Sequence, residues 1–333
     1  SAYAFHGVFS GSQNDKIDDQ FRVMAFRNPI VESASVSRFI FTNLDEGTKV
    51  VDIDLIGHGK VKFFTFFVQV PGLKADYHEV DFDNLYTEEE IDHLDEYQLR
   101  AKLEKLPCCT TDEDGTENGD PLNLVLIGSR EDMSSAFVHR GWLPAEQTYG
   151  KAVWKTIKSF LFGTRYRYSP VSPLYFEKRQ QGFAGQKPRH TVHQRNHLRV
   201  WLSPMRYQGK PVWVGQISRD IGVRFTFKTW PPVTHKIDPD VDEARASLIE
   251  DLVISQQLAK TGWVKGVGAA TRKKPRYNLT GDPYFTDGYR AVLVFDRRPR
   301  SFLELDKFDW ENPISTQLRR LETDRQPDFD EGW

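Results

Sequence analysis

The feature that most restricts the fold is a pair of alternating runs that flank Gln208 and Gly209. Residues 197–202 and 211–218 alternate apolar and polar side chains, which is the pattern of strands with one buried face. A two-residue turn joins antiparallel neighbours. The runs therefore predict a hairpin, and one of its faces carries the apolar side chains Leu198, Val200, Leu202, Trp213 and Ile217.

The other face of this hairpin is polar: it carries His197, Arg199, Trp201, Gln216, Ser218 and Asp220. If Tyr207 pairs with Lys210, His197 lies directly across from Asp220. A one-residue bulge would break that register. A structural salt bridge is the competing interpretation of His197 and Asp220, because ion pairs also form outside active sites.

The net charge of −2 conceals a strong separation of charge along the chain. Residues 1–120 carry 11 Lys or Arg and 24 Asp or Glu, whereas residues 139–236 carry 18 and 3. A basic, aromatic-rich stretch is typical of sites for phosphate-bearing partners, whether nucleic acid, anionic lipid headgroups or small molecules. Alternatively, the acidic part packs against the basic part and neutralises it. Nucleic acid is the weakest candidate, because the pI is about 6.5 and no nucleic-acid motif is present.

The first 106 residues predict an acidic, β-rich segment followed by one helix. Residues 51–55 alternate apolar and acidic side chains, a turn follows at 57–59, and an apolar run over 60–70 completes a hairpin with one buried face. Thr87 and Glu90 have the spacing of a capping box, which predicts a helix over about 88–105.

The acidic residues 107–121 predict a linker or a long surface loop, because they hold little that could bury apolar area. This segment contains the only cysteines of the chain, Cys108 and Cys109. Adjacent residues place their sulfur atoms poorly for a disulfide, so the sequence predicts neither a structural disulfide nor a zinc site there.

From residue 122 onwards, predicted strands and helices alternate. They are a strand over 122–127, a helix from Ser129 to Arg140, a helix over 145–162, an irregular segment over 166–194, a helix over 239–260 capped by Asp238, and a strand over 289–295. The fold class that follows is a mixed α/β, or α+β, domain over 122–296, in which helices flank an antiparallel-rich mixed sheet. A charged tail over 297–333 completes the chain.

Imidazoles and carboxylates gather around the predicted hairpin. His197, Asp220 and His235 are the candidate catalytic residues, because histidine beside carboxylates suits general acid–base chemistry. The same residue types bind divalent metals, so His197, His235, Asp238 and Asp242 are candidate metal ligands. Asp238 and Asp242 also suit the start of a helix, where acidic residues are favoured without any ligand. No established catalytic motif is present.

Binding of an anionic group requires cationic and hydrogen-bonding side chains. The candidates are Arg195, Arg199, Trp201, Gln216, Arg219 and Lys236. The arginines and the lysine would supply charge, and Trp201 would supply a flat packing surface.

Five short motifs resemble the LssY C-terminal domain family. They are Gly-Asp-Pro-Leu-Asn-Leu-Val-Leu-Ile-Gly at 119–128, Ser-Pro-Val-Ser-Pro-Leu-Tyr at 169–175, Asn-His-Leu-Arg-Val-Trp at 196–201, Trp-Val-Gly at 213–215 and Thr-His-Lys-Ile-Asp-Pro-Asp-Val-Asp at 234–242. The resemblance covers about 119–295 and implies a bacterial, envelope-associated protein, since such domains occur beside membrane modules of the lipid-phosphatase and DedA types. It implies no particular reaction, because the family has no established activity.

We therefore expect an envelope domain, periplasmic or membrane-associated, whose basic middle binds an anionic small molecule or lipid headgroup. One alternative is a metal-assisted hydrolase that uses His197, Asp220 and His235. Another is a non-enzymatic module that binds a membrane or envelope protein of a secretion system. The cytoplasm stays open as a location, because the chain begins at Ser1 and the lack of a leader is no evidence.

Overall fold

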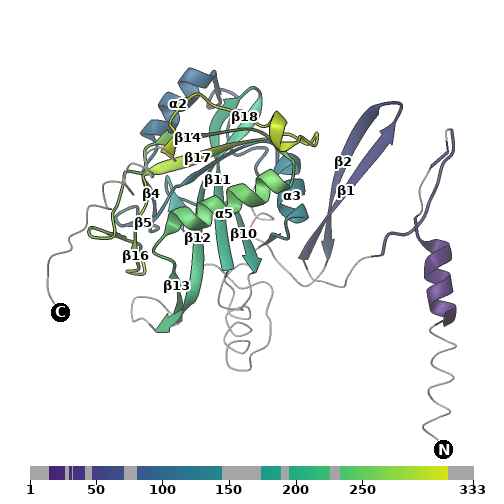
Figure 1. Ribbon diagram of the computed structural model, residues 1–333, viewed down its shortest axis with the longest axis horizontal. Coiled ribbons are helices and arrows are strands. Elements are labelled where there is room, and N and C mark those ends of the chain that lie inside the picture. The colour runs from purple at the N-terminus through teal and green to yellow at the C-terminus, as the bar shows by residue number, and fades with distance from the viewer. Residues whose placement is uncertain are drawn as a thin grey trace, which may run out of the picture. The chain divides into compact units, whose positions relative to one another are not determined.

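The computed structural model describes residues 15–26, 30–31, 33–41, 47–70, 81–144, 174–188, 195–225 and 233–313 (Figure 1). The chain divides into two compact units, residues 1–46 and 47–333. In the first unit, residues 15–24 are helical and Ala25 pairs with Phe39. Among the described residues, no helix is long and apolar enough to cross a membrane.

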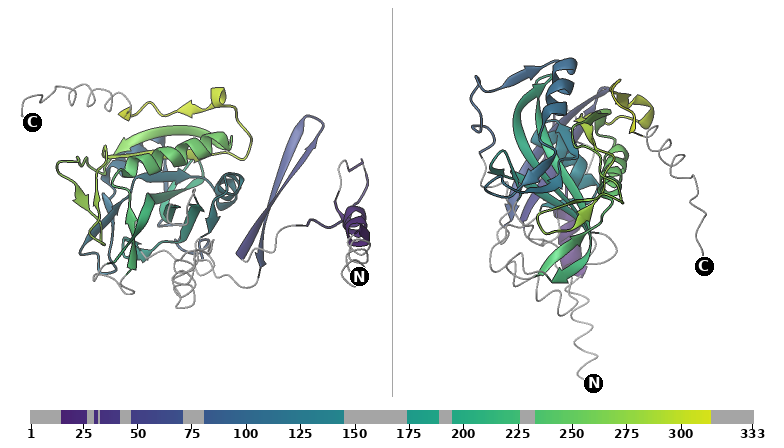
Figure 2. Two further views of the ribbon diagram at one scale, coloured as in Figure 1. Left: turned by 60° about the horizontal axis from the view of Figure 1, so that its bottom comes forward. Right: turned by 90° about the vertical axis from the view of Figure 1, so that its left-hand side faces the viewer.

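A curled mixed sheet forms the centre of the second unit (Figures 1 and 2). Its described strands run in the order β18-β14-β17-β6-β12-β11-β10-β7, with β13 paired to β12 and β3 paired to β11. Their bounds are β3 (Asp92–Leu94), β6 (Leu124–Ile127), β7 (Leu143–Pro144), β10 (Phe183–Pro188), β11 (Arg195–Tyr207), β12 (Lys210–Phe225), β13 (Val233–Ile237), β14 (Leu258–Lys265), β17 (Tyr289–Phe295) and β18 (Asp306–Lys307). Most pairs are antiparallel, so the predicted α+β class with an antiparallel-rich mixed sheet is confirmed.

Two helices cover one face of this sheet: α3 (Arg130–His139) and α5 (Val241–Ile254) (Figure 2). The predicted apolar face of the hairpin packs here, as Leu198, Val200, Leu202, Trp213 and Ile217 share a core with side chains of both helices. Helix α3 forms where predicted, because the Ser129 side chain accepts a hydrogen bond from the Asp132 amide. It stops at Gly141, whose φ of 73° favours glycine.

The buried carboxylate of Asp251 ties α5 to its neighbours. It accepts hydrogen bonds from Lys187 Nζ at 2.6 Å, from Trp142 Nε1 at 3.3 Å and from Arg140 Nη2 at 3.4 Å. These donors come from β10 and from the end of α3, so a single side chain holds three elements of this layer together.

The other face of the sheet is covered by α2 (Glu96–Lys105) and by a smaller sheet of order β5-β4-β8-β9. The bounds of these strands are β4 (Cys109–Thr111), β5 (Asn118–Pro121), β8 (Tyr175–Phe176) and β9 (Arg179–Gln180). A second core lies between these layers and includes Leu103, Phe176, Trp201 and Val214.

The predicted linker over 107–121 instead contains β4 and β5. Thr110, Gly119 and Asp120 are buried, and Thr110 Oγ1 donates to the Asp120 carbonyl at 3.1 Å. A Cβ atom on Gly119 would lie 2.7 Å from Thr110 Oγ1, so glycine permits the close approach of the two strands. Also against expectation, Cys108 and Cys109 form a disulfide between adjacent residues.

The C-terminal end of α2 is capped by a side chain that comes much later in the sequence. Arg290, which is fully buried, donates to the carbonyls of Leu103 at 3.0 Å, Leu106 at 3.1 Å and Lys265 at 3.2 Å, and also to that of Pro107. The last carbonyls of a helix lack partners within the helix, and a cation there also complements the helix dipole. Arg290 therefore serves as the C-terminal cap of α2.

The predicted helix over 88–105 begins later, at Glu96. Asp95 is the N-cap and forms a capping box with Gln98, whereas Thr87 and Glu90 close a separate turn. Residues 92–94 lie outside the helix because they pair as β3 with β11.

The predicted helix over 239–260 is also shorter, because residues from Leu258 onwards pair as β14 with β17. Its N-cap is Asp240, whose side chain accepts from the Glu243 amide, and not Asp238. The predicted helix over 145–162 lies outside the described residues. Within the segment 166–194, which the sequence predicts to be irregular, residues 174–188 are described and contain β8, β9 and β10, so the prediction is wrong there.

Two outer segments complete the unit. The predicted hairpin is present as β1 (Gly47–Gly57) and β2 (Lys60–Val70), with His58 and Gly59 at φ of 48° and 70° in the turn. No buried face is found among its described side chains, where Phe66 and Val68 are about half exposed. The start of the tail adds β18 to the sheet and places Phe308 in the core.

Candidate functional site

The β11–β12 hairpin keeps the predicted faces but not the predicted register. Tyr207 pairs with Lys210 as expected, and an irregularity between Leu202 and Arg206 then shifts the pairing. His197 consequently lies opposite Ser218, and Asp220 is its diagonal neighbour. The shift amounts to two residues, so every side chain stays on its predicted face.

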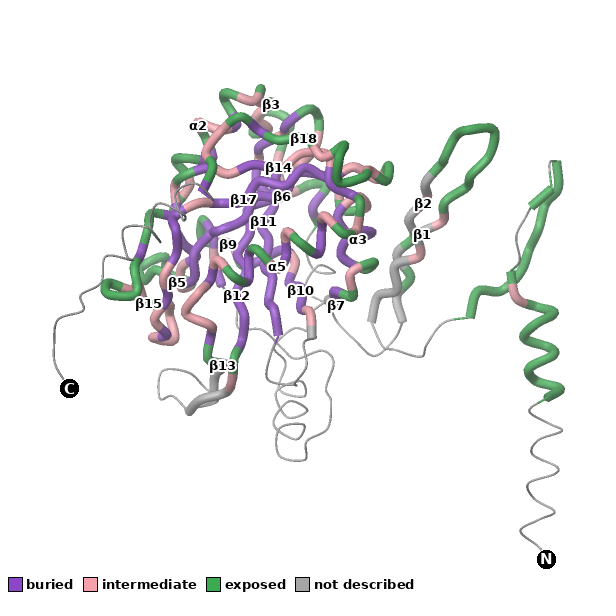
Figure 3. Tube along the Cα trace, in the orientation of Figure 1, coloured by how far each residue is buried: buried purple, intermediate pink, exposed green. Residues whose placement is uncertain are grey.

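The polar face forms a row of three cationic or titratable side chains on β11, which we call the polar row: Arg195, His197 and Arg199. Each contacts a side chain of a neighbouring strand. Arg195 Nη1 donates to Gln186 Oε1 at 2.7 Å, His197 Nε2 lies 2.6 Å from Asp220 Oδ2, and Arg199 Nη1 donates to Gln216 Oε1 at 3.0 Å. All six side chains are buried, and Figure 3 shows β11 and β12 buried along most of their described length.

The same face is apolar nearer the hairpin turn. Trp201 and Val214 are paired across the strands there and belong to the second core. The face therefore changes from apolar, at the pair Trp201 and Val214, to charged at the next pair on the same face, Arg199 and Gln216.

Two further segments bring carboxylates to the polar row. Asp120, from β5, accepts a hydrogen bond from Asn278 Nδ2 at 3.1 Å, and Asp282 follows Asn278 in the same loop. Burial raises the pKa of the Asp120 carboxyl above its usual range; Arg199 opposes this rise, and nearby Asp220 adds to it. Burial lowers the pKa of the Arg195 guanidinium, and Asp220 opposes that change.

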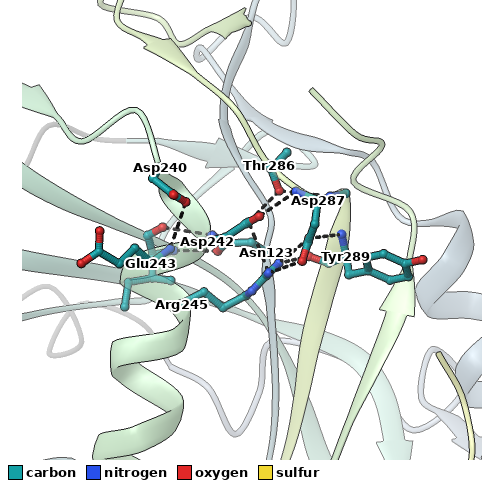
Figure 4. A network of polar contacts seen from close by, with 10 residues as sticks. Asn123, Asp240, Asp242, Glu243, Arg245, Thr286, Asp287 and Tyr289 are labelled. Carbon is teal, nitrogen blue, oxygen red and sulfur yellow. Dashed lines mark hydrogen bonds and ion pairs between the residues drawn. The ribbon is translucent and has the colours of Figure 1, made fainter. Parts of the chain in front are cut away.

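A second polar network joins α5 to the start of β17, on the face of the sheet that α3 and α5 cover (Figure 4). Arg245 Nη1 and Nη2 donate to the two carboxylate oxygens of Asp287 at 3.1 and 2.7 Å. Asp242 accepts from Thr286 Oγ1 at 2.7 Å and from the Asp287 amide at 2.6 Å. Burial raises the pKa of the Asp242 carboxyl, and Arg245 opposes the rise. Asp242 is thus committed to this network.

Asn123 binds the backbone of β12, the strand that pairs with the polar row. Its side chain donates to the Ile217 carbonyl at 3.1 Å and accepts from the Ile217 amide at 3.0 Å, next to Ser218. Asn123 thereby holds β12 in place immediately before Ser218 and Asp220.

The other sequence-predicted binding residues lie elsewhere. Arg219 points to the face of the sheet that α3 and α5 cover. Its Nη1 lies 2.5 Å from Glu243 Oε1 and 3.6 Å from Asp238 Oδ2. Trp201 packs among the apolar side chains of the second core and its Nε1 donates to the Arg179 carbonyl at 2.9 Å, so its ring contacts core side chains. Lys236 is exposed on β13.

Among the predicted metal ligands whose side chains are described, His197 is not grouped with Asp238 and Asp242. Asp238 lies near Arg219 and Asp242 accepts a hydrogen bond from Thr286, on the face of the sheet that α3 and α5 cover. His197 belongs to the polar row on the opposite face. His235 lies on β13 opposite Val223, and its side chain is outside the described part. Among the described residues, no three His, Cys, Asp or Glu side chains are grouped so that they could hold a metal ion.

Sequence reasoning missed Gln186, Asp120, Asn278 and Asp282 as members of this site. Only Asp120 had a signal, since it belongs to the Gly-Asp-Pro motif at 119–121. The others come from segments that only the tertiary fold brings to β11.

A family model for the LssY C-terminus matches residues 100–289, which is more than half of the chain. The chain belongs to the LssY C-terminal family. The match begins within α2, earlier than the sequence motifs predict, and includes the polar row of this LssY C-terminal domain and most of the network around Arg245. Searches of curated proteins and of solved structures give no significant match.

Proposed function

We propose that this LssY C-terminal domain binds a small anionic ligand of the phosphate class through Arg195 and Arg199. One observation carries the proposal: each cationic or titratable side chain of the polar row is oriented by a side chain of a neighbouring strand. Guanidinium groups that are held in place lose little conformational freedom when they bind, and their planar donors match the oxygens of phosphate.

The cost of burial supports this choice. A buried charge stabilises a fold poorly, and apolar side chains of similar volume often do as well or better. The same two strands use apolar side chains on the same face one pair further along, at Trp201 and Val214. Selection for stability alone would favour continuing that pattern, so the retained charges favour a functional role.

The two arginines lie on either side of His197 along β11. Alternate residues of a strand are roughly 6.5 to 7 Å apart, so the Cα atoms of Arg195 and Arg199 are roughly 13 to 14 Å apart, and their long side chains would converge on a ligand between them. Asp220 lies beside His197, and Asp120, whose carboxyl pKa is raised by burial, lies near Arg199. A ligand phosphate would meet two guanidinium groups in this setting.

Calorimetric titration with inorganic phosphate and with glycerol 3-phosphate, at constant ionic strength in chloride, tests the proposal. Glycerol 3-phosphate represents a lipid headgroup without a bilayer, so tighter binding than phosphate would favour the headgroup. Arg199→Gln should weaken binding by about tenfold or more, since a charged hydrogen-bonding group contributes roughly 1.5 to 3 kcal/mol. Arg130→Gln, at an exposed arginine that pairs with Asp83, should leave it unchanged.

Loss of fold is the main confounding effect, because Arg199 is buried. Arg199→Lys keeps the charge and should restore part of the affinity, and circular dichroism should show equal secondary structure in all variants. Failure of the wild-type protein to bind either probe would refute the proposal, and so would equal affinities of wild type and Arg199→Gln.

The distance of 2.6 Å between His197 and Asp220 favours a second candidate, a hydrolase with His197 as general acid or base. In that case Asp220 would fix the orientation of the imidazole. Turnover of p-nitrophenyl phosphate by the purified protein, with and without added divalent metal, tests it. His197→Gln should lower turnover by about 10² to 10⁴, whereas His139→Gln, at an exposed histidine, should not. Absence of wild-type turnover would remove this candidate for phosphoester substrates.

The envelope location and a membrane-protein partner are proposed on the family resemblance alone. Fractionation of native cells tests the location. Crosslinking of intact cells followed by mass spectrometry tests the partner, and an Arg199→Ala variant that loses a partner but no turnover would favour the non-enzymatic interaction module.

A further inference from the structure

A short turn after β17 presents two large apolar side chains to solvent. The turn, residues 297–305, contains the 3₁₀ helix η2 (Phe302–Glu304), and we call it the tip. Phe302 is 73% exposed and Leu303 is 93% exposed. Single exposed apolar residues are common on protein surfaces. Two adjacent, highly exposed apolar side chains within one turn are less common and require a specific explanation.

The outward direction of these side chains is fixed by hydrogen bonds. The Ser301 amide donates to Glu304 Oε2 at 2.8 Å, and the Glu304 amide donates back to the Ser301 carbonyl at 3.0 Å. The Arg300 amide donates to the Gln256 carbonyl at 2.8 Å, while Leu305 packs against the main core. The tip is therefore anchored at both ends, with Phe302 and Leu303 between the anchors.

Three arginines, Arg297, Arg298 and Arg300, precede this apolar pair in the sequence. The acidic residue within the tip is Glu304, which bonds to Ser301, so three arginines and one glutamate give residues 297–305 a net charge of +2. Asp296, which pairs with Arg300, and Asp306 border the tip. Ile254, which is 61% exposed, ends α5 two residues before Gln256, the residue that anchors Arg300. The tip thus combines protruding apolar groups with a net positive charge.

We propose that the tip docks on an anionic lipid surface, with Phe302 and Leu303 inserted at the boundary between headgroups and acyl chains and the arginines close to the lipid phosphates. Peripheral proteins bind bilayers through this combination of apolar and cationic groups. A protein partner fits less well, because a stable protein interface buries about 1,000 Å² or more with good complementarity. A bilayer accepts a few protruding side chains without a matching surface.

This surface is independent of the phosphate site. The polar row pairs with β12 at Gln216 and Ser218. Strand β6 pairs with β12 nearer the hairpin turn, and the end of β17 lies beside the end of β6. The tip, which follows β17, therefore lies at the hairpin-turn end of the sheet. Lipid docking at the tip and ligand binding at the row would therefore fail or succeed separately.

Cosedimentation of the whole chain with vesicles of phosphatidylcholine, with or without phosphatidylglycerol, tests the proposal. We expect binding to the anionic vesicles that weakens with added salt. The double variant Phe302→Ser with Leu303→Ser should reduce the partition coefficient by about tenfold or more, and Arg298→Gln by about fivefold. Tyr97→Ser, at an aromatic side chain that is 82% exposed on α2, is the matched control and should leave it unchanged.

Three results would overturn the proposal: no binding of the wild-type chain to anionic vesicles, equal binding of wild type and double variant, or an equal loss of binding in Tyr97→Ser. Sedimentation velocity covers the main rival. If the wild type self-associates without binding vesicles and the double variant is monomeric, the tip is a contact between copies of the chain. Affinity for phosphate should be the same in the double variant as in the wild type, which separates this test from that of the proposed function.

Discussion

Replacing Arg290 by methionine should lower the free energy of unfolding by about 4 kcal/mol. The substitution keeps a long side chain in place but leaves the carbonyls of Leu103, Leu106, Pro107 and Lys265 without their donor. Buried carbonyls without a partner are costly, and three of these lie at the end of α2, where no donor within the helix can replace the guanidinium.

Two opposing contributions, the hydrogen bonds of Arg290 and the cost of burying its charge, determine the expected change in the free energy of unfolding. Hydrogen bonds from a charged donor contribute roughly 1.5 to 3 kcal/mol each, so four of them give roughly 6 to 12 kcal/mol. Burial lowers the pKa of Arg290 to about 10, which corresponds to a cost of roughly 3 kcal/mol for the charged form. Because bonds that share one guanidinium are not additive, we expect a result near the lower end of the difference, about 4 kcal/mol.

Urea unfolding followed by circular dichroism measures this change. Arg272→Met, at an exposed arginine, should stay within about 0.5 kcal/mol of wild type. Arg290→Lys keeps the charge but loses the fork of donors, so it should lose about half as much as Arg290→Met. A value for Arg290→Met within about 1 kcal/mol of wild type would refute the assignment of Arg290 as the cap of α2.

Three further predictions concern single positions. Gly266→Ala should destabilise the protein by about 3 kcal/mol in the same urea assay, because its φ is +130° and the added Cβ would lie 2.0 Å from Arg290 Nη1; a neutral effect would contradict this packing. Asp251→Asn should cost about 2 to 3 kcal/mol, since it leaves the partly buried Lys187 and Arg140 without their carboxylate, whereas exposed Glu250→Gln should cost little; equal effects would count against the Asp251 cluster. Burial raises the pKa of Asp120, so the folded state holds this proton more tightly and loses that contribution as pH rises through the raised pKa. Thermal melts should therefore show Asp120→Asn more stable than wild type at neutral pH, with the advantage shrinking toward pH 3.8, and a constant difference would be inconsistent with a raised pKa.

The faces of the central hairpin could be predicted from sequence, because strand periodicity is local. Leu198 and His197 alternate toward opposite sides whatever the exact pairing. The register was not predicted in full, although the irregularity between Leu202 and Arg206 contains Pro204, and a proline inside a strand often marks a bulge. Its effect on the site is small, because a diagonal neighbour such as Asp220 is still within reach of an imidazole.

The predicted helix boundaries were wrong where two local signals competed. Thr87 and Asp95 both begin the sequence pattern of a capping box, but only Asp95 forms one, because residues 92–94 pair as β3 with β11 and Thr87 closes a separate turn. The prediction over 107–121 was wrong for its two ends, which pair as β4 and β5 with a close approach at Gly119, whereas residues 113–117 between them are exposed.

The candidate site was predictable only in its local part. Arg195, His197, Arg199 and Asp220 lie on two strands joined by a short turn, so alternation alone places them on one face. Partners such as Asp282, which is far along the chain, depend on how the loop before β17 folds back over β5. Periodicity carries no information on such contacts.

The position of Arg290 also decides where a shortened version of the protein should end. The family match stops at residue 289, one position before the guanidinium that closes α2, although the match itself begins within α2. A recombinant piece cut at those limits would carry the helix and lack its cap, and would also omit the remainder of β17, next to β6. Pieces for expression and crystallisation should therefore run past Phe308, so that the helix end, the final strand and the sheet edge stay together.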